Sequence, residues 1–344
     1  MDDLARYQKQ MLFDGIGEQG QRRIRDSRAV LIGCGALGCV VADQLVRAGI
    51  GELRIIDRDF VELSNLQRQI LFTEQDVHDH LPKAIAAARR LQLVNSSVDI
   101  RPHVTDVDFR NIRELAEDVD LLLDGTDNFE TRFLVNDFAL EQAVPWIFTG
   151  CTGSVGQVMP IIPGRSGCLQ CLISEAPPPG STETCDTAGV VGPAIGVAAS
   201  QQAALALRIL SGHTDDIPLA LIMIDAWDGS QRRMDVSGLA AGGRCRACAG
   251  ERRYLDGSRV SGSSVLCGRN AVQISPAGKL SVSLEELAQR LESAGTVSSN
   301  PFLARVVLNE SNMEISVFPD GRAIIRGTED PAVARAIYSR YIGA

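Results

Sequence analysis

The first 150 residues alternate between short apolar runs and longer segments in which apolar positions recur at helical spacing. The apolar runs predict strands at Arg28–Ile32, in the run that ends in Asp57, and at Val98–Val104, Val119–Leu123 and Pro145–Cys151. Helical spacing follows Gly38, starts again near Pro82 and returns at Glu130–Gln142. This alternation of strand and helix is typical of a doubly wound, Rossmann-like and mostly parallel sheet.

Beyond residue 150 the pattern changes to that of antiparallel strands, which are predicted at Gly156–Ile162, Leu219–Trp227 and Gln231–Val236. An uncharged segment, Thr187–Leu207, is long enough to span a bilayer. Its glycine, proline, serine and glutamine residues make it too polar for insertion, so a buried or interface helix is expected there.

The last part of the chain forms a separate pattern. A polar, Gly/Ser-rich linker is predicted at 251–263, and a small α/β domain at 264–344. Its predicted strands are Ser264–Ile274, Arg305–Leu308, Met313–Phe318 and Arg322–Arg326, and its predicted helices are Leu284–Ala294 and Pro331–Tyr341. The order favours a two-layer sandwich. The preceding domain, 1–250, divides into a nucleotide-binding half (about 26–150) and an antiparallel half (about 151–250).

The composition of this α/β chain excludes some classes of partner and cellular setting. The net charge of −9 and the pI near 5.1 argue against DNA or RNA as a partner. The first ten residues do not have the pattern of a signal peptide. Nine cysteines are an odd number for a disulfide framework, so a reduced, cytoplasmic setting is expected.

The loop after the first strand is Gly33-Cys34-Gly35-Ala36-Leu37-Gly38. Glycines let a backbone approach phosphate, and the following helix N-terminus attracts negative charge. Asp57 comes roughly 20 residues later, where a carboxylate would hold ribose hydroxyls. Alone, this pattern fits NAD, FAD and ATP equally.

The stretch Asp59–Gln69 distinguishes these ligands. It places Asn65, Arg68 and Gln69 directly after the ribose carboxylate, and an arginine fork with amides suits a triphosphate rather than a dinucleotide. The run D-x-D-x-V-E-x-S-N-L-x-R-Q resembles the ThiF/MoeB/HesA adenylating enzymes, relatives of ubiquitin-activating enzymes. Further motifs of the family follow in order: the N-terminal RYQKQ, the glycine loop, Lys83, LLLDGTDN with Arg132 and Asn136, and the segment from Cys185 to Gly212.

The resemblance, which covers residues 1 to about 250, implies an ATP-dependent acyl-adenylation. The C-terminal glycine carboxylate of a ubiquitin-like sulfur carrier (ThiS- or MoaD-like, ending in Gly-Gly) would attack the α-phosphate and release pyrophosphate. By resemblance the ATP site would comprise Gly33, Gly35, Ala36, Gly38, Asp57, Asp59, Asn65, Arg68, Gln69, Lys83, Asp127 and Asn128. Arg68 and Lys83 would neutralise the triphosphate and Asp127 would hold Mg²⁺. The family also implies a homodimer.

Two residues depart from the family pattern. Ala36 stands where the family usually has a second adjacent glycine, and its methyl group reduces the room near the α-phosphate. Lys9 stands where an arginine normally reaches the γ-phosphate from a partner subunit. Lysine supplies the charge without the bidentate fork.

Five of the cysteines belong to two candidate sites. Cys168-x-x-Cys171 and Cys245-x-x-Cys248 match a closed, structural zinc site of four thiolates, which would staple two distant strands. Cys185, before a predicted helix, matches in position a family cysteine that is implicated in thioester or sulfur-transfer chemistry in some members and is dispensable in others; an unreactive loop cysteine is the alternative. An NAD-linked oxidoreductase and a non-catalytic scaffold remain as other functions.

Overall fold

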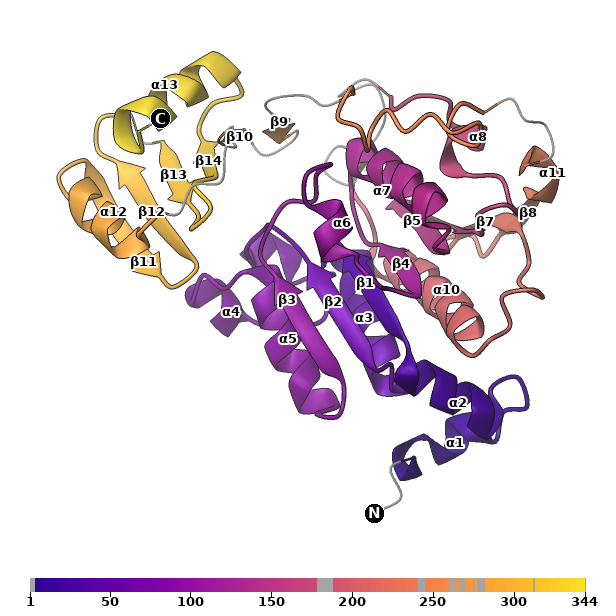
Figure 1. The fold of residues 1–344 in the computed structure, drawn as a ribbon. Helices are drawn as coiled ribbons and strands as arrows, with labels where there is room; N and C mark the ends of the chain where they lie inside the picture. Colours follow the sequence, from indigo (N-terminus) through magenta and orange to yellow (C-terminus); the bar gives the residue numbers. More distant parts are fainter. Residues whose placement is uncertain are drawn as a thin grey trace. The chain divides into compact units, whose positions relative to one another are not determined.

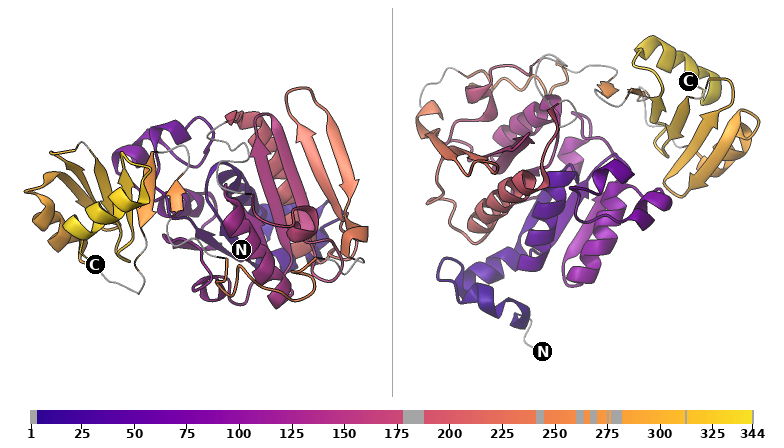
Figure 2. Two further views of the ribbon diagram at one scale, coloured as in Figure 1. Left: turned by 90° about the horizontal axis from the view of Figure 1, so that it is seen from above. Right: turned by 180° about the vertical axis from the view of Figure 1, so that it is seen from behind.

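The computed structural model describes residues 4–177, 188–240, 245–259, 264–266, 270–274, 276, 282–311 and 313–343. The chain divides into two compact units, with the boundary after Arg259. Figures 1 and 2 show the elements of each unit.

The first unit is built on a sheet whose strand order is β3-β2-β1-β4-β5-β6-β7-β8. Its strands are β1 (Arg28–Ile32), β2 (Glu52–Ile56), β3 (Asp99–His103), β4 (Leu121–Asp124), β5 (Trp146–Thr152), β6 (Val155–Ile161), β7 (Ala220–Asp225) and β8 (Gln231–Asp235). The pairs from β3 to β5 are parallel, and those from β5 to β8 are antiparallel. The predicted Rossmann-like sheet that continues into antiparallel strands is therefore confirmed.

Helices cover both faces of this sheet. The helices of this unit are η1 (Ala5–Tyr7), α1 (Gln8–Met11), α2 (Gly17–Asp26), α3 (Ala36–Ala48), η2 (Leu63–Asn65), α4 (Glu74–His78), α5 (Lys83–Val94), α6 (Ile112–Leu115), α7 (Phe129–Gln142), α8 (Leu169–Leu172), α10 (Gly192–Leu210) and α11 (Ser237–Ala240). Helices α3, α5 and α10 pack together over one face. A core around Phe133, Trp146 and Phe148 joins α6 and α7 to the other face.

From Gly192 to Leu207 the uncharged segment belongs to α10, which packs one side against α3, β5 and β6. Among the helices of the described residues, none combines the length and the hydropathy that a membrane span requires. The prediction of a buried or interface helix agrees with α10, which buries one side and exposes Val197 on the other.

The second unit is one antiparallel sheet covered by two helices. Its strands β9 (Ser264–Leu266), β10 (Ala271–Ile274), β11 (Gly295–Asn300), β12 (Leu303–Leu308), β13 (Glu314–Val317) and β14 (Ala323–Arg326) are ordered β11-β12-β13-β14-β10-β9. Helices α12 (Leu284–Leu291) and α13 (Pro331–Tyr341) share one core with the inner strand residues. This is the predicted two-layer sandwich.

Two predictions for this unit were wrong. Ser264–Ile274 is two antiparallel strands, β9 and β10, rather than one; Asn270 has a positive φ of 44° just before β10, which ends a continuous strand. The edge strand β11 was missed, because its sequence, GTVSSN, is polar and has no apolar alternation.

Candidate functional site

The glycine loop links β1 to α3 at the carboxyl end of the sheet, where open α/β sheets bind ligands. Gly33 has a φ of +88°, and a Cβ there would lie 2.6 Å from the Gly125 carbonyl carbon. A Cβ on Gly38 would lie 2.2 Å from the Gly33 carbonyl oxygen. These two glycines are therefore required by the close packing of the chain on itself.

Gly35 differs from the other two glycines of the loop. A Cβ on Gly35 would meet only the Gly125 oxygen at 3.9 Å and the Gln69 amide nitrogen at 4.0 Å. The fold does not need a glycine here, so the missing side chain leaves space for a ligand. Ala36, the departure from the family pattern, is the first residue of α3.

Asp57 holds the glycine loop in place through its side chain. Its two carboxylate oxygens each accept one backbone hydrogen bond, from the Cys34 and Asp59 amides, both at 2.7 Å. Burial raises the pKa of Asp57, while Lys83 and the two amides oppose that shift. The predicted ribose ligand is thus also the residue that ties the end of β2 to the glycine loop.

The predicted triphosphate residues Asn65 and Gln69 lie on the turn around η2 and are buried. The Asn65 side chain accepts the Glu62 amide at 3.0 Å and so closes the start of η2. Gln69 is only 4% exposed. Its amide nitrogen faces Gly35 and its oxygen Oε1 has no hydrogen-bond partner in the described part of the chain. A buried, unsatisfied amide beside open space indicates a ligand site.

Lys83 begins α5 and reaches the same region. Its Nζ lies 3.2 Å from Asp59 Oδ2 and its side chain is 5% exposed. The ion pair with Asp59 thus places the ammonium group of Lys83 at the nucleotide end of the sheet. Arg68 is half-buried, and its Nη1 donates to the Ser64 carbonyl at 3.0 Å.

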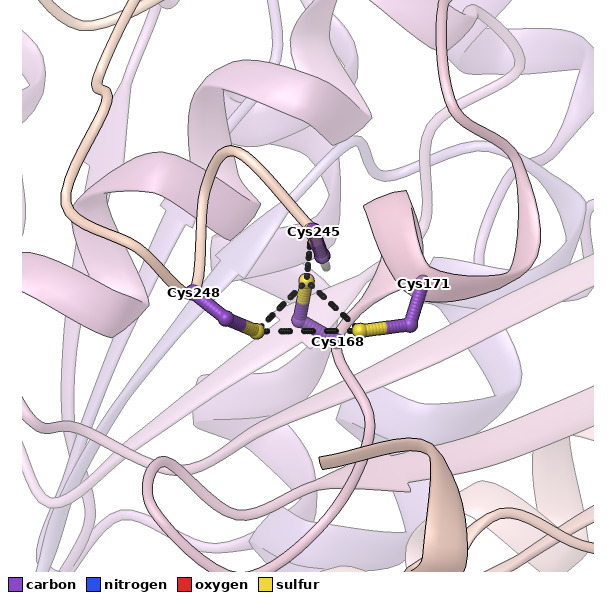
Figure 3. A group of neighbouring side chains, drawn as sticks. All are labelled: Cys168, Cys171, Cys245 and Cys248. Carbon is purple, nitrogen blue, oxygen red and sulfur yellow. Dashed lines mark hydrogen bonds between the residues drawn. The ribbon is translucent and has the colours of Figure 1, made fainter. Parts of the chain in front are cut away.

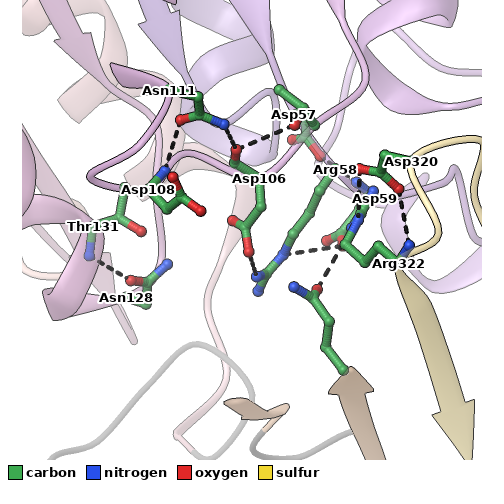
Figure 4. A network of polar contacts seen from close by, with 12 residues as sticks. Asp57, Arg58, Asp59, Asp106, Asp108, Asn111, Asn128, Thr131, Asp320 and Arg322 are labelled. Carbon is green, nitrogen blue, oxygen red and sulfur yellow. Dashed lines mark hydrogen bonds and ion pairs between the residues drawn. The ribbon is translucent and has the colours of Figure 1, made fainter. Parts of the chain in front are cut away.

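Asp127 and Asn128 follow β4, but they have different environments. The Asp127 side chain is exposed and makes no hydrogen bond in the ranges that the structure describes. Asn128 caps α7 by accepting the Thr131 amide at 2.8 Å, a contact visible in Figure 4. The first is available to a cation, and the second holds the helix.

A buried ion pair, Asp124 with Arg132, orients this loop. Arg132 Nε donates to Asp124 Oδ2 at 2.9 Å, and its Nη2 donates to the carbonyls of Thr126 and Thr149. Asp124 also accepts the Thr126 amide at 2.9 Å. The arginine therefore joins the end of β4 and the loop after it to the middle of β5.

Gln202 strengthens the same junction from α10. It is fully buried, and its amide donates to the carbonyls of Asp124 and Ile147 at 3.0 and 3.1 Å. The sequence motifs included Arg132 without assigning it a role, and they assigned none to Gln202. The only local signal was an arginine one helical turn after the Asn128 cap.

Lys9 lies far from the glycine loop of its own chain. It is exposed on α1, whose neighbour Gln10 donates to the carbonyl of Ala48 at the end of α3. Since α3 starts at the loop and a residue adds about 1.5 Å, Lys9 is roughly 20 Å away. The other predicted catalytic residue, Cys185, lies outside the described residues.

Cys168, Cys171, Cys245 and Cys248 form one cluster, with all sulfur atoms within 4.8 Å of one another (Figure 3). Four of the Sγ–Sγ distances are 3.5, 3.6, 3.6 and 3.8 Å. Sulfurs bound to one zinc at about 2.3 Å form a tetrahedron with edges of about 3.8 Å. The four residues therefore fit zinc.

The zinc-type cluster joins a short helix to a turn rather than two strands, contrary to the prediction. Cys168 precedes α8 and Cys171 lies within it, while Cys245 and Cys248 lie in the turn after residue 244. Helices and turns provide the tight bends that bring both thiols of a Cys-x-x-Cys pair to one ion, which an extended strand cannot.

Helix α7 connects the cysteine cluster to the carboxyl end of the sheet, where the glycine loop lies. Asn136 Oδ1 accepts the Leu169 amide at 2.8 Å. Asp137 accepts the Gln170 side chain at 2.9 Å and the Tyr254 amide at 3.0 Å. The helix that Asn128 caps therefore also carries the residues that hold α8.

Comparisons with known proteins find relatives in sequence and in fold. The sulfur carrier protein ThiS adenylyltransferase of Bacillus subtilis is 42% identical over 341 residues, which are 98% of this chain and 99% of that protein. The similarity therefore extends into the second unit, which the sequence motifs left out. The sulfur carrier protein adenylyltransferase of Thermus thermophilus is 37% identical over 255 residues, 73% of this chain and 92% of that protein.

A solved structure of Escherichia coli MccB with MccA-N7isoASN superposes with a TM-score of 0.63 at 22% identity, over 72% of this chain and 75% of that one. At this identity the likeness concerns the fold. The model of the ThiF family matches residues 7–245. Most of the chain, including the glycine loop and the polar turn, lies within this match, and the protein belongs to the ThiF family.

Proposed function

We propose that this protein uses ATP to adenylate the C-terminal glycine carboxylate of a ubiquitin-like sulfur carrier that ends in Gly-Gly. The observation that carries the proposal is the open space beside Gly35, which is bordered by the unsatisfied Gln69 amide. A glycine cradle with a buried amide and Lys83 suits a triphosphate. The names of the relatives in Bacillus and Thermus support the carrier as substrate.

The reaction forms one bond and breaks one. A carboxylate oxygen of the carrier attacks the α-phosphorus, and the bond from that phosphorus to the oxygen bridging the β-phosphate breaks. Pyrophosphate leaves with the electron pair, and the carrier becomes an acyl-adenylate. Lys83 and Arg68 stabilise the negative charge that accumulates on the phosphate oxygens.

The other residues of the site have supporting parts. Asp57 accepts from the ribose while it holds the loop, and Asn65 and Gln69 orient the phosphates. Asp127 would hold Mg²⁺, which neutralises phosphate charge when bound. The four cysteines would hold a structural zinc with no open coordination position.

Exchange of labelled pyrophosphate into ATP tests the proposal. We expect exchange that depends on a carrier ending in Gly-Gly and is absent with the same carrier shortened by one residue. Asp127→Ala should abolish exchange without changing the melting temperature, because the side chain is exposed. Absence of exchange with every such carrier would refute the proposal. Full activity of Asp127→Ala would refute the magnesium role.

Lys9 can act only on a second copy of the chain, because it is roughly 20 Å from its own loop. We therefore include a homodimer in the proposal. Light scattering should give twice the chain mass. Lys9→Ala and Asp127→Ala should each be inactive alone and recover exchange when mixed, since one site of the mixed dimer is complete. A monomer, or no recovery, would contradict action across the dimer.

A further inference from the structure

Arg58 lies directly between the two predicted nucleotide residues Asp57 and Asp59, and the sequence motifs assign it no part. Its Nη1 donates to Asp106 Oδ2 at 2.8 Å, and its Nε lies 3.8 Å from Asp59 Oδ1. Figure 4 shows the guanidinium between these carboxylates. The side chain is 22% exposed. Two ion pairs thus hold a planar cation in one orientation at the site.

The strand order determines which part of a nucleotide would meet Arg58. The glycine loop follows β1, Asp57 follows β2, and Asp106 belongs to the loop after β3. These strands are adjacent, in the order β3-β2-β1. With phosphates at the end of β1 and ribose at the end of β2, the base extends toward the end of β3. Arg58 bridges the ends of β2 and β3, so it lies on the side of the base.

The surrounding charge decides between two ligands that an arginine here could take. In related sheets an arginine near the ribose accommodates a 2′-phosphate. Burial opposes the charge of Arg58, but the carboxylates of Asp106, Asp59 and Asp127 raise its pKa overall. The paired carboxylates of Asp106 and Asp59 already balance the charge of Arg58, so a 2′-phosphate would gain little from it. A neutral heterocycle does not need that charge, and guanidinium faces stack well on such rings.

We propose that Arg58 is a specificity-determining residue whose guanidinium, clamped edge-on by Asp106, stacks on the adenine of ATP. The proposal rests on the proposed use of ATP, but it does not depend on the carrier. It distinguishes Arg58 from Arg68 and Lys83, which act on phosphate. Edge-on clamping by a carboxylate is compatible with stacking, because the base contacts the flat face of the guanidinium.

The test compares Arg58→Ala and Arg58→Lys with the control Arg101→Ala, an exposed arginine on β3. Calorimetry measures binding of ATP and of inorganic triphosphate, and pyrophosphate exchange gives KM for ATP and kcat. We expect both Arg58 variants to weaken ATP binding and raise KM about 5- to 150-fold, the range of one base stack. Triphosphate binding and kcat should not change.

Three outcomes would overturn the inference. ATP binding within twofold of wild type would show that Arg58 does not contact the base. Equal weakening of ATP and triphosphate binding would make it a phosphate ligand. A lysine variant that binds ATP normally would show that charge, rather than the plane, matters. If Arg58→Ala does not fold, Asp106→Leu removes the carboxylate that Arg58 contacts and should weaken ATP binding selectively. Wild-type protein that binds ATP but shows no exchange refutes the proposed function alone.

Discussion

The glycine loop and the cysteine cluster are held in place in opposite ways. The loop is fixed by the chain itself, through the two amides that Asp57 accepts and the close approach of Gly33 to Gly125. The cluster brings four sulfurs within 4.8 Å with no covalent bond between them. A preorganised backbone can bind and release a ligand many times, whereas a closed thiolate site retains its ion as part of the fold.

The largest effect should come from the cluster. Structural zinc sites contribute on the order of 10 kcal/mol to folding. We expect Cys171→Ser with Cys248→Ser to lose the metal and to unfold at least about 10 °C below wild type. Metal content by mass spectrometry and a melting curve check this. Cys151→Ala, a buried cysteine outside the cluster, is the control. A double variant that melts at the same temperature as this control would show that the cluster does not hold a structural metal.

The next largest loss of stability should come from breaking the buried Asp124–Arg132 ion pair. Arg132→Met leaves Asp124 buried without its cation, and breaking such a pair costs about 3–5 kcal/mol. The matched control, Arg113→Met, breaks an exposed pair with Glu141, worth less than about 1 kcal/mol. Urea unfolding measures both. Equal losses would mean that burial of the Asp124–Arg132 pair is unimportant.

The two glycines Gly38 and Gly35 separate packing from ligand binding. Gly38→Ala forces a methyl group against the Gly33 carbonyl, so we expect a loss of about 1–3 kcal/mol in stability. Gly35→Ala meets no atom closer than 3.9 Å, so stability should hold while kcat/KM for ATP falls about 10- to 100-fold. Unfolding curves and pyrophosphate exchange test this. Normal exchange in Gly35→Ala would show that the open space is not the phosphate site.

The effect that is smallest per step, about 1 kcal/mol for each pH unit, concerns the contacts by which α7 holds α8. Burial raises the pKa of Asp137 to about 6, and an unfolded aspartate titrates near 4. Between these values the folded chain binds more protons, so stability falls as pH rises from about 4 to about 6, by about 1 kcal/mol per unit. Above pH 6 this contribution is constant.

Asp137→Asn should remove that slope. Protonation of the cluster thiols at low pH acts on both proteins, so the readout is the difference between their unfolding free energies at each pH. A difference that does not change between pH 4 and pH 6 would contradict the assigned pKa.

The sequence predicted the elements whose pattern is local. The strand ending at Asp57, the helix after Pro82 and the helix Pro331–Tyr341 follow from apolar spacing and from glycine or proline signals. The cysteine pairs were recognisable because their spacing is set by one ion. The short helix α8 was not predicted, since four residues are too few to show a period.

Long-range contacts could not be predicted in this way. Arg132 contacts Thr149, and Gln202 reaches Asp124 and Ile147, across strands that meet only in the folded sheet. Arg58 was missed because its partner Asp106 is on the next strand's loop. Spacing along the chain carries no information about such pairs.

Helix α7 fixes the number of residues between Arg132 and Asn136. It begins at the Asn128 cap and presents Asn136 and Asp137 to α8 two turns later. Inserting or deleting one residue between Arg132 and Asn136 would turn the second group by about 100° about the helix axis. Either Arg132 or the pair beyond it would then point into solvent. Substitutions that keep the volume of the buried side chains Phe133, Leu134 and Val135 fit this segment, whereas a one-residue insertion or deletion breaks one of the two contacts.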